Sequence, residues 1–220
     1  MKKEEIYKKI VLGILFVFPL LVYLFFASGK NNFAKLPILS EKIMEIPQNN
    51  SKVFSMLNNH ITILGYWGGS LENKKAEALN LNEKIYKRFY QFNDFQFVFL
   101  VDSDKKQEVE ELKSSLKQGV GTNLSRWNFV TGNRDSIYNI AKSYLLVAEK
   151  GINSDHGGFI HSGDFVLIDN KGRIRSGYDT NGNPIGAYDG TSAQSVKDLI
   201  VDVGVLVKEI KREKQSSEKR

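Results

Sequence analysis

Phe95-Gln96-Phe97-Val98-Phe99-Leu100-Val101 is the stretch that decides the fold of this chain of 220 residues. The run is short and almost continuously apolar. Such a run is typical of a strand that is covered on both faces in the middle of a sheet. We therefore predict a central buried strand here, and the segments on either side indicate what packs around it.

Strand and helix patterns alternate outward from this run. His60–Tyr66 is rich in strand-forming residues and ends in Gly68-Gly69, and Trp127–Thr131 predicts a further strand. Helical spacing lies between these strands, at Leu71, Ala78, Leu81, Ile85 and Phe89 after a capping Ser70, and at Val109, Leu112 and Leu116 within a charged helix over Lys105–Gln118.

The second half of the chain continues the alternation and ends in a hairpin and a helix. Strands over Phe165–Asp169 and Arg173–Tyr178 flank a hairpin turn. The helical stripes are Ile137, Ile140, Ala141, Tyr144 and Leu145 before a glycine-rich loop over 149–160, and Val196, Leu199, Ile200, Val203, Val207 and Ile210 in the last helix, Ser192–Ile210. Strands that alternate with helices imply parallel pairing. We therefore predict an α/β domain over 60–210 with a thioredoxin-like fold, a central mixed sheet flanked by helices.

The N-terminal region predicts one transmembrane helix. Residues 10–28 carry no charge and would span roughly 28 Å as a helix, close to the thickness of the hydrocarbon core. Four lysines precede the segment within residues 1–9, so the positive-inside rule puts the N-terminus in the cytoplasm and the domain on the periplasmic or extracytoplasmic side. A cleaved signal peptide is the alternative, although the apolar stretch is long for one.

Composition and charge narrow the function classes. The net charge of +6 is concentrated at the two ends, with four Lys against two Glu in residues 1–9 and six Lys or Arg against three Glu in residues 208–220. No basic patch interleaved with aromatic residues is seen, which argues against a nucleic-acid partner. We expect residues 29–59 to form a tether that leads into the domain and residues 211–220 to be a charged, disordered tail.

Cysteine is absent from the sequence, which excludes disulfides, zinc–thiolate sites and cysteine nucleophiles in this chain. His156 and His161, with Asp155 and Asp164 nearby, could form a nitrogen and oxygen site for zinc or Cu(II). The simpler interpretation is a solvated His156 and a hydrogen-bonded His161. Asp102 and Asp104 likewise admit two interpretations, a catalytic pair of carboxylates or a turn that caps the helix at Lys105, and the second is preferred.

Several of these segments, in the same order, resemble the Sco/SenC family. The similar stretches are Val101-Asp102-Ser103-Asp104 after the central strand, Trp127-Asn128-Phe129-Val130-Thr131-Gly132, the helix over Ser136–Val147, and His161-Ser162 before the hairpin. The resemblance covers roughly residues 36–210. It implies a thioredoxin-like fold, copper held by a Cys-x-x-x-Cys pair and one histidine, and a role in the assembly of cytochrome c oxidase.

The resemblance places the copper-binding cysteines in the turn over 66–73. Gly68 or Gly69 stands near the first cysteine position and Glu72 or Asn73 near the second, whereas His161 matches the histidine ligand. One imidazole without thiolates does not hold Cu(I) tightly, because soft sulfur supplies most of that selectivity. We therefore expect no bound cofactor and no thiol redox chemistry.

The expected function is a non-enzymatic, membrane-anchored protein that binds a partner in respiratory oxidase assembly. The candidate contact surface consists of Trp67, Gly68, Gly69, Asp102 and His161. A buried Trp67 packed against the first helix is the alternative for that residue. The alternative function is a metal carrier that uses His161 with His156 or carboxylates. A thiol-independent enzyme is the third hypothesis.

Overall fold

The computed structural model describes residues 2–28, 35–40, 57–68, 71, 74–120, 123–144 and 164–217. The chain divides into two compact units, Met1–Ala34 and Lys35–Arg220. The first contains the helix α1, Lys2–Ser28. The stretch Ile6–Phe25 of this helix has a mean hydropathy of 2.1 and is long and apolar enough to cross a membrane. Its large apolar side chains are exposed within the unit, as expected for a segment whose apolar partner is lipid or a processing receptor.

The second unit is built on a mixed sheet with the strand order β3-β2-β1-β4-β5. Its strands are β1 (Ile61–Trp67), β2 (Phe95–Asp102), β3 (Trp127–Gly132), β4 (Asp164–Ile168), β5 (Ile174–Arg175) and β6 (Tyr188–Asp189). The strands β1, β2 and β3 are parallel, whereas β4 is antiparallel to β1, β5 and β6. The predicted parallel core with an antiparallel hairpin edge is therefore confirmed.

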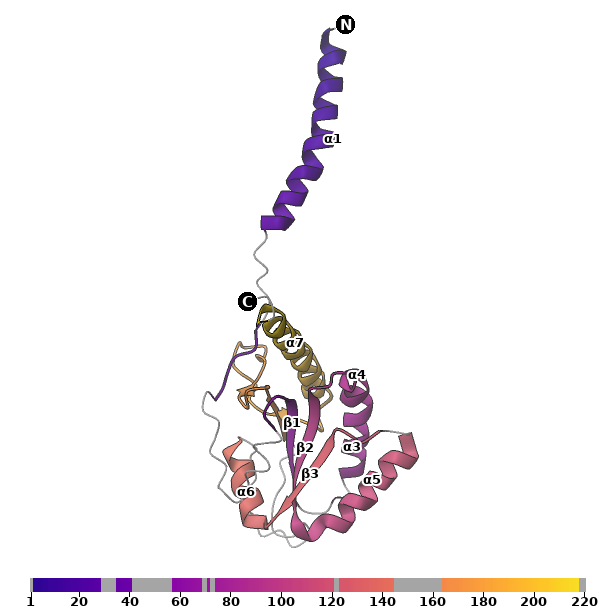
Figure 1. The fold of residues 1–220 in the computed structure, drawn as a ribbon, viewed down its shortest axis with the longest axis vertical. Coiled ribbons are helices and arrows are strands. Elements are labelled where there is room, and N and C mark those ends of the chain that lie inside the picture. The colour runs from indigo at the N-terminus through magenta and orange to yellow at the C-terminus, as the bar shows by residue number, and fades with distance from the viewer. Residues whose placement is uncertain are drawn as a thin grey trace. The chain divides into compact units, whose positions relative to one another are not determined.

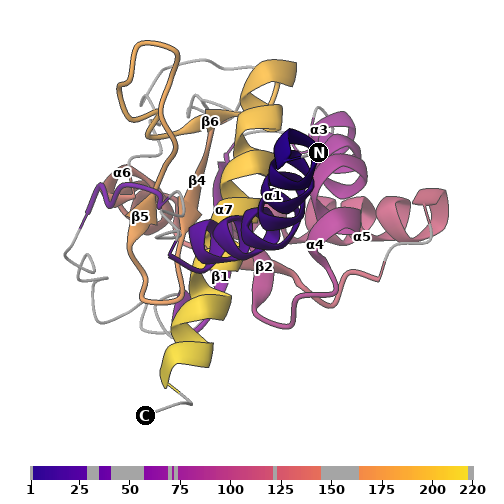
Figure 2. The same cartoon turned by 90° about the horizontal axis from the view of Figure 1, so that it is seen from above.

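Helices cover both faces of this sheet (Figures 1 and 2). They are α3 (Lys75–Leu81), which continues through η3 (Asn82–Tyr86) into α4 (Lys87–Phe89), then η4 (Ser103–Lys105), α5 (Lys106–Val120), α6 (Arg134–Ser143) and α7 (Ala193–Ser217). The apolar stripes of α3, α5 and α7 pack on one face in a core that includes Ile63, Phe97 and Phe99. The stripe of α6 packs on the other face with Leu64, Val98 and Leu100.

The predicted central strand is fully buried on both faces, as its composition requires. Every residue of β2 is buried, because α5 and α6 lie on opposite sides of the sheet and β1 and β3 pair with its two edges. The predicted hairpin turn is also present. Gly172 takes φ of 76°, a left-handed conformation that glycine adopts without strain, and its N–H donates to the carbonyl oxygen of Asp169 at 2.9 Å.

Two predicted boundaries differ in the structure. The domain begins at Lys35 rather than at residue 60, because Leu36 and Leu57 are buried and Ile38 forms a bridge with Arg175. The last helix continues to Ser217, so the prediction of a disordered tail is wrong for residues 211–217. Ion pairs of Glu213 with Lys171 and of Lys214 with Asp94 hold that last stretch of α7 against the domain.

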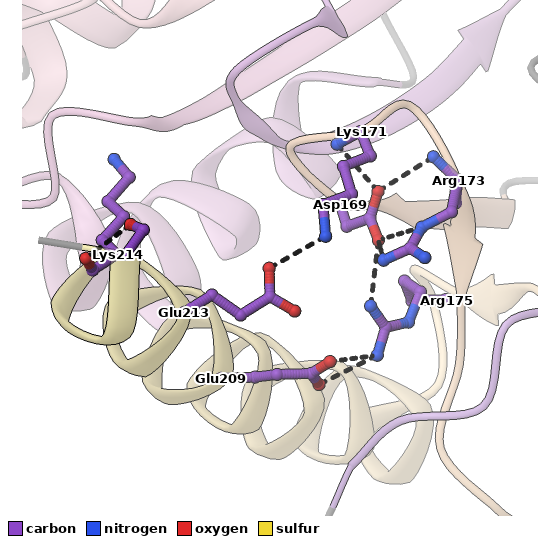
Figure 3. A network of polar contacts seen from close by, with 8 residues as sticks. Asp169, Lys171, Arg173, Arg175, Glu209, Glu213 and Lys214 are labelled. Carbon is purple, nitrogen blue, oxygen red and sulfur yellow. Dashed lines mark hydrogen bonds and ion pairs between the residues drawn. The ribbon is translucent and has the colours of Figure 1, made fainter. Parts of the chain in front are cut away.

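Arg175 is the centre of a polar network that joins three parts of the second unit (Figure 3). Its guanidinium is 2% exposed and donates to Asp169 in the hairpin at 2.9 Å, to the Leu36 carbonyl oxygen at 2.7 Å and to both carboxylate oxygens of Glu209 on α7. Asp169 also accepts from Arg173. Burial alone would raise the pKa of Asp169, but the hydrogen bonds from Arg173 and Arg175 lower it. The network fixes the beginning of the domain, the hairpin and α7 to one another.

The carboxyl of Asp202 is also buried, but its hydrogen bonds offset only part of the effect of burial on its pKa. Asp202 on α7 is 7% exposed and accepts hydrogen bonds from the Tyr188 hydroxyl at 2.6 Å and from the Gly177 N–H at 3.0 Å. Gly177 is required at this contact, because a Cβ atom there would overlap the carboxylate. Burial is the largest cause that raises the pKa of Asp202, and the two hydrogen bonds offset it only in part.

We expect Asp202→Asn to change how stability depends on pH. A carboxyl with a raised pKa takes up its proton in the folded state first, so Asp202 contributes stability that increases as the pH falls from neutral toward the unfolded value of about 4. The amide oxygen of asparagine can accept the same two hydrogen bonds without a charge. Denaturant unfolding at several pH values should show a flatter profile above pH 4 for Asp202→Asn. An unchanged profile would contradict the assignment, and Asp198→Asn provides the control on the same helix.

Gly204 offers a second stability test on α7. It lies inside the helix, and a Cβ atom there would meet nothing within 4 Å. A glycine inside a helix costs about 0.5–1 kcal/mol relative to alanine when no contact requires it. Gly204→Ala should therefore raise the free energy of unfolding by that amount in chemical denaturation. Loss of stability would show that another group occupies the open space.

Candidate functional site

The candidate site lies where the carboxyl ends of three parallel strands meet. In the sheet register Trp67 pairs with Val101 and Asp102 pairs with Gly132, so β1, β2 and β3 end at one edge. Ligands bind outside this edge in open α/β sheets. The candidate residues Trp67, Gly68 and Asp102 are thus brought together, as the sequence predicts.

Trp67 does not form part of the surface at this edge. Its side chain is fully buried and stacks on Phe99 with ring centroids 3.9 Å apart, and Phe129 packs beside it. This corrects the expectation of an exposed aromatic contact and agrees with the alternative of a buried Trp67. The period of two along β1 places Trp67 on the same face as Ile61 and Ile63, and that alternation is the signal for its burial.

The turn after β1 is held by a carboxylate from α5. The Leu71 N–H donates to Glu108 Oε2 at 2.8 Å, and Lys105 Nζ donates to Glu108 Oε1 at 2.8 Å. Burial alone would raise the pKa of Glu108, but these two hydrogen bonds lower it, so the carboxylate stays charged. Glu108 is a site residue that sequence reasoning missed, because a charged position in a charged helix carries no sign of a partner 37 residues away.

Asp102 is buried and paired with an arginine. Its side chain is 1% exposed, and Arg134 at the start of α6 donates to Asp102 Oδ2 at 3.1 Å and to Asp104 Oδ2 at 3.1 Å. Asp102 stands at the start of η4 but makes no side-chain capping bond, so the capping interpretation is wrong for this residue. The expectation that the Asp102 side chain belongs to a contact surface is corrected by its burial, because Asp102 is the last residue of the central strand β2, in which every residue is buried.

The local environment makes Asp102 a weaker acid. Burial is the main cause that raises its pKa, Arg134 opposes the shift, and the neighbouring Asp104 adds to it. Asp102 in turn raises the pKa of Tyr66, after burial, which is the larger cause. Across the part of the chain that the structure describes, Asp102 Oδ1 and Trp67 Nε1 have no hydrogen-bond partner. The edge therefore holds a buried carboxyl and a phenol beneath the exposed groups of Asp104 and Arg134.

Three of the candidate residues, Gly69, His156 and His161, lie outside the described residues, and so do Ser70, Glu72 and Asn73 in the turn. Gly68 is described and is buried at the end of β1. Within the described ranges, no group of three His, Cys, Asp or Glu side chains could hold a metal ion. Copper in the thiolate mode implied by the resemblance does not fit this chain, because the sequence contains no cysteine.

Comparison with known proteins gives matches among solved structures only. No family profile and no curated protein matches the sequence. BsSco, a member of the Sco family of cytochrome c oxidase assembly proteins, matches with a TM-score of 0.50 at 16% identity, over 69% of this chain and 83% of BsSco. A SCO1/SenC family lipoprotein from Bacillus anthracis gives 0.49 at 23% identity, over 70% and 84% of the two chains.

The copper-bound ScoI of Arabidopsis thaliana gives a TM-score of 0.42 at 20% identity, over 72% of this chain and 88% of ScoI. At these identities, the match to BsSco shows a shared fold. The predicted thioredoxin-like fold with a mixed sheet flanked by helices is confirmed. The resemblance to the Sco/SenC proteins is thus confirmed in the fold, and this chain contains no cysteine.

Proposed function

We propose that this chain is a membrane-anchored, non-redox relative of the Sco/SenC proteins that binds a partner during the assembly of a respiratory copper oxidase. The observation that carries the proposal is a Sco-like fold in a sequence with no cysteine. A scaffold without thiolates retains its shape and its binding surfaces but not the soft ligands or the nucleophile.

The anchor is residues 10–28 within α1. The lysine-rich residues before it favour a cytoplasmic N-terminus and an extracytoplasmic domain. Anchoring would hold the domain near integral membrane partners. Extraction of membranes with alkaline carbonate tests this step, because an anchored chain stays in the membrane fraction and a chain cleaved after the apolar segment is released.

The proposed absence of copper and thiol chemistry has a direct test. Full-length protein incubated with Cu(I) and then challenged with a chelator should retain no stoichiometric metal, since no thiolate is present. Retention of one tightly held copper ion per chain would overturn the non-redox assignment. If that binding disappeared in His161→Ala, the metal-carrier hypothesis with His161 and His156 would replace it. Thiol oxidoreductase activity of the purified chain would likewise contradict a non-enzymatic role.

We place the partner surface over the carboxyl ends of the parallel strands. With Trp67 and Asp102 buried, the charged groups that we place on this surface are Asp104, whose side chain is 57% exposed, and Arg134, whose side chain is 37% exposed. Gly68 is buried as well, which corrects its expected place in the contact surface, whereas Gly69 and His161 remain proposed members. An exposed acid beside an arginine offers one hydrogen-bond acceptor and several donors to a polar partner surface.

Affinity capture of the full-length chain from membranes tests this surface. We expect the copper-bearing subunits of the oxidase in the captured material, and a loss of about tenfold for Asp104→Lys, because a like charge then faces the partner's cation. Glu110→Lys on α5 is the matched control, since Glu110 has a side chain 71% exposed and forms an ion pair with Lys113 on the same helix. Failure to recover an oxidase subunit, or equal recovery with Asp104→Lys and wild type, would count against the proposal.

A further inference from the structure

The exposed face of α7 carries a row of mostly basic and polar side chains. The outer stripe consists of Lys197, Val201, Gly204, Lys208, Lys211 and Gln215. These residues follow one another at steps of three or four, so they lie on one face of the helix. The opposite face is buried in the core. The stripe contains three lysines, no acidic residue and an exposed apolar side chain, Val201, which is 56% exposed.

The chain leading into the domain runs beside this helix. Arg175 donates to Glu209 on α7 (Figure 3) and to the Leu36 carbonyl oxygen, so one guanidinium joins the first residues of the domain to α7. Residues 29–34 are the whole link between Ser28, the last residue of α1, and Lys35. Seven peptide steps reach at most about 25 Å. A lipid surface that holds α1 is therefore always within reach of the domain.

We propose that the outer stripe of α7 binds an anionic lipid surface. The inference rests on the proposed insertion of α1 in a membrane. Lysines next to a membrane attract anionic headgroups, and their long stems let the charge stay at the headgroups while an apolar side chain such as Val201 enters the interface. The short link raises the effective concentration of lipid at the stripe, which lets a contact of few charges form. A protein with an acidic surface reaches the domain only by diffusion, whereas lipid surrounds an inserted α1 at all times, so lipid is the favoured occupant.

The absence of cysteine makes a clean test available. Full-length Val201→Cys, labelled with an environment-sensitive dye, is reconstituted in phosphatidylcholine vesicles with and without phosphatidylglycerol. With the anionic lipid, we expect a blue-shifted emission and roughly threefold or greater protection from an aqueous quencher. The protection should be lost at high salt and in the Lys208→Glu, Lys211→Glu double variant. The same dye at Gln107→Cys, an exposed position on α5, should not respond.

The outcomes separate this inference from the proposed anchor. Protection that is equal in neutral and anionic vesicles, or that survives the double variant, would overturn the lipid contact. Protection that appears only after an acidic protein is added would also overturn it. A chain that floats with the vesicles while the dye stays silent refutes the stripe alone, whereas a chain that does not float at all refutes both. Circular dichroism of each variant checks that α7 is folded.

Discussion

Replacing Arg175 with methionine is expected to lower the free energy of unfolding by about 3–5 kcal/mol. The change keeps most of the apolar stem but removes the only described guanidinium that reaches Asp169, Glu209 and the Leu36 carbonyl oxygen together. Asp169 keeps its bonds from Arg173, but the Glu209 carboxylate, only 12% exposed, is left without its partner. Chemical denaturation of the full-length protein in detergent measures the loss.

A double variant separates two causes of the loss, namely the missing ion pair and the Glu209 carboxylate that is left buried without a cation. Adding Glu209→Leu to Arg175→Met removes the uncompensated carboxylate, and a well-packed apolar pair often costs little compared with a buried ion pair. We expect the double variant to recover a large part of the lost stability. If both variants were equally unstable, the penalty would have to come from the Leu36 carbonyl oxygen or from packing. Arg173→Gln is the milder control, because Arg173 is 22% exposed.

The same network predicts sensitivity to acid. The pKa of Asp169 is lowered in the folded state, so its contribution to stability is fully present above the unfolded value of about 4 and is lost as the pH falls through the folded value. Asp202 acts in the opposite direction. Between neutral pH and pH 3, Asp202→Asn should therefore show a larger net loss of stability than the wild type, because it lacks the stability that the wild type gains above pH 4 but keeps the loss below pH 4.

The second large effect is expected at Trp67. Trp67→Ala should destabilise the domain by about 3–5 kcal/mol, because it leaves a large cavity beside Phe99 and Phe129 in the core. Trp67→Phe keeps an aromatic ring on Phe99 and should cost less. Thermal unfolding of the three proteins gives the comparison.

An exposed aromatic residue serves as the control for Trp67. Tyr178 is 57% exposed, and Tyr178→Ala should change stability by less than about 0.5 kcal/mol. A Trp67→Ala protein as stable as Tyr178→Ala would show that Trp67 is a surface residue after all. This comparison matters for the capture experiment. If Trp67→Ala bound the partner less, the loss could otherwise be attributed to a missing contact rather than to an unstable domain.

The parts of the fold that repeat a local pattern could be predicted from the sequence. The apolar run of β2, the stripe Val109, Leu112 and Leu116 of α5, and the turn at Gly172 all lie where their spacing or composition puts them. Each of these depends on residues within a few positions of one another. The alternation along β1 also contained the information that Trp67 points inward.

Long-range polar pairing had no such signature. Arg134 reaches Asp102 and Glu108 reaches Leu71 across more than 30 residues, and nothing in either segment identifies its partner. The extension of α7 to Ser217 was not predicted for the same reason, because Lys214 forms an ion pair with Asp94, which is far away in the sequence. The positions of His156 and His161 lie outside the described residues, so the metal-site hypothesis stays a prediction.

The pairing of β1 with strands on both of its edges constrains the order in which the sheet forms. On one edge, β1 pairs in parallel with β2, the next strand along the chain. On its other edge it pairs with β4, which follows about a hundred residues later, and contacts so distant in sequence slow folding. The first residues of the domain find their partners even later in synthesis. Leu39 forms a hydrogen bond with Ile174, and the Leu36 carbonyl oxygen accepts one from Arg175. During synthesis, the nascent domain must therefore remain incomplete, with one side of its sheet open, until nearly the whole chain has left the ribosome.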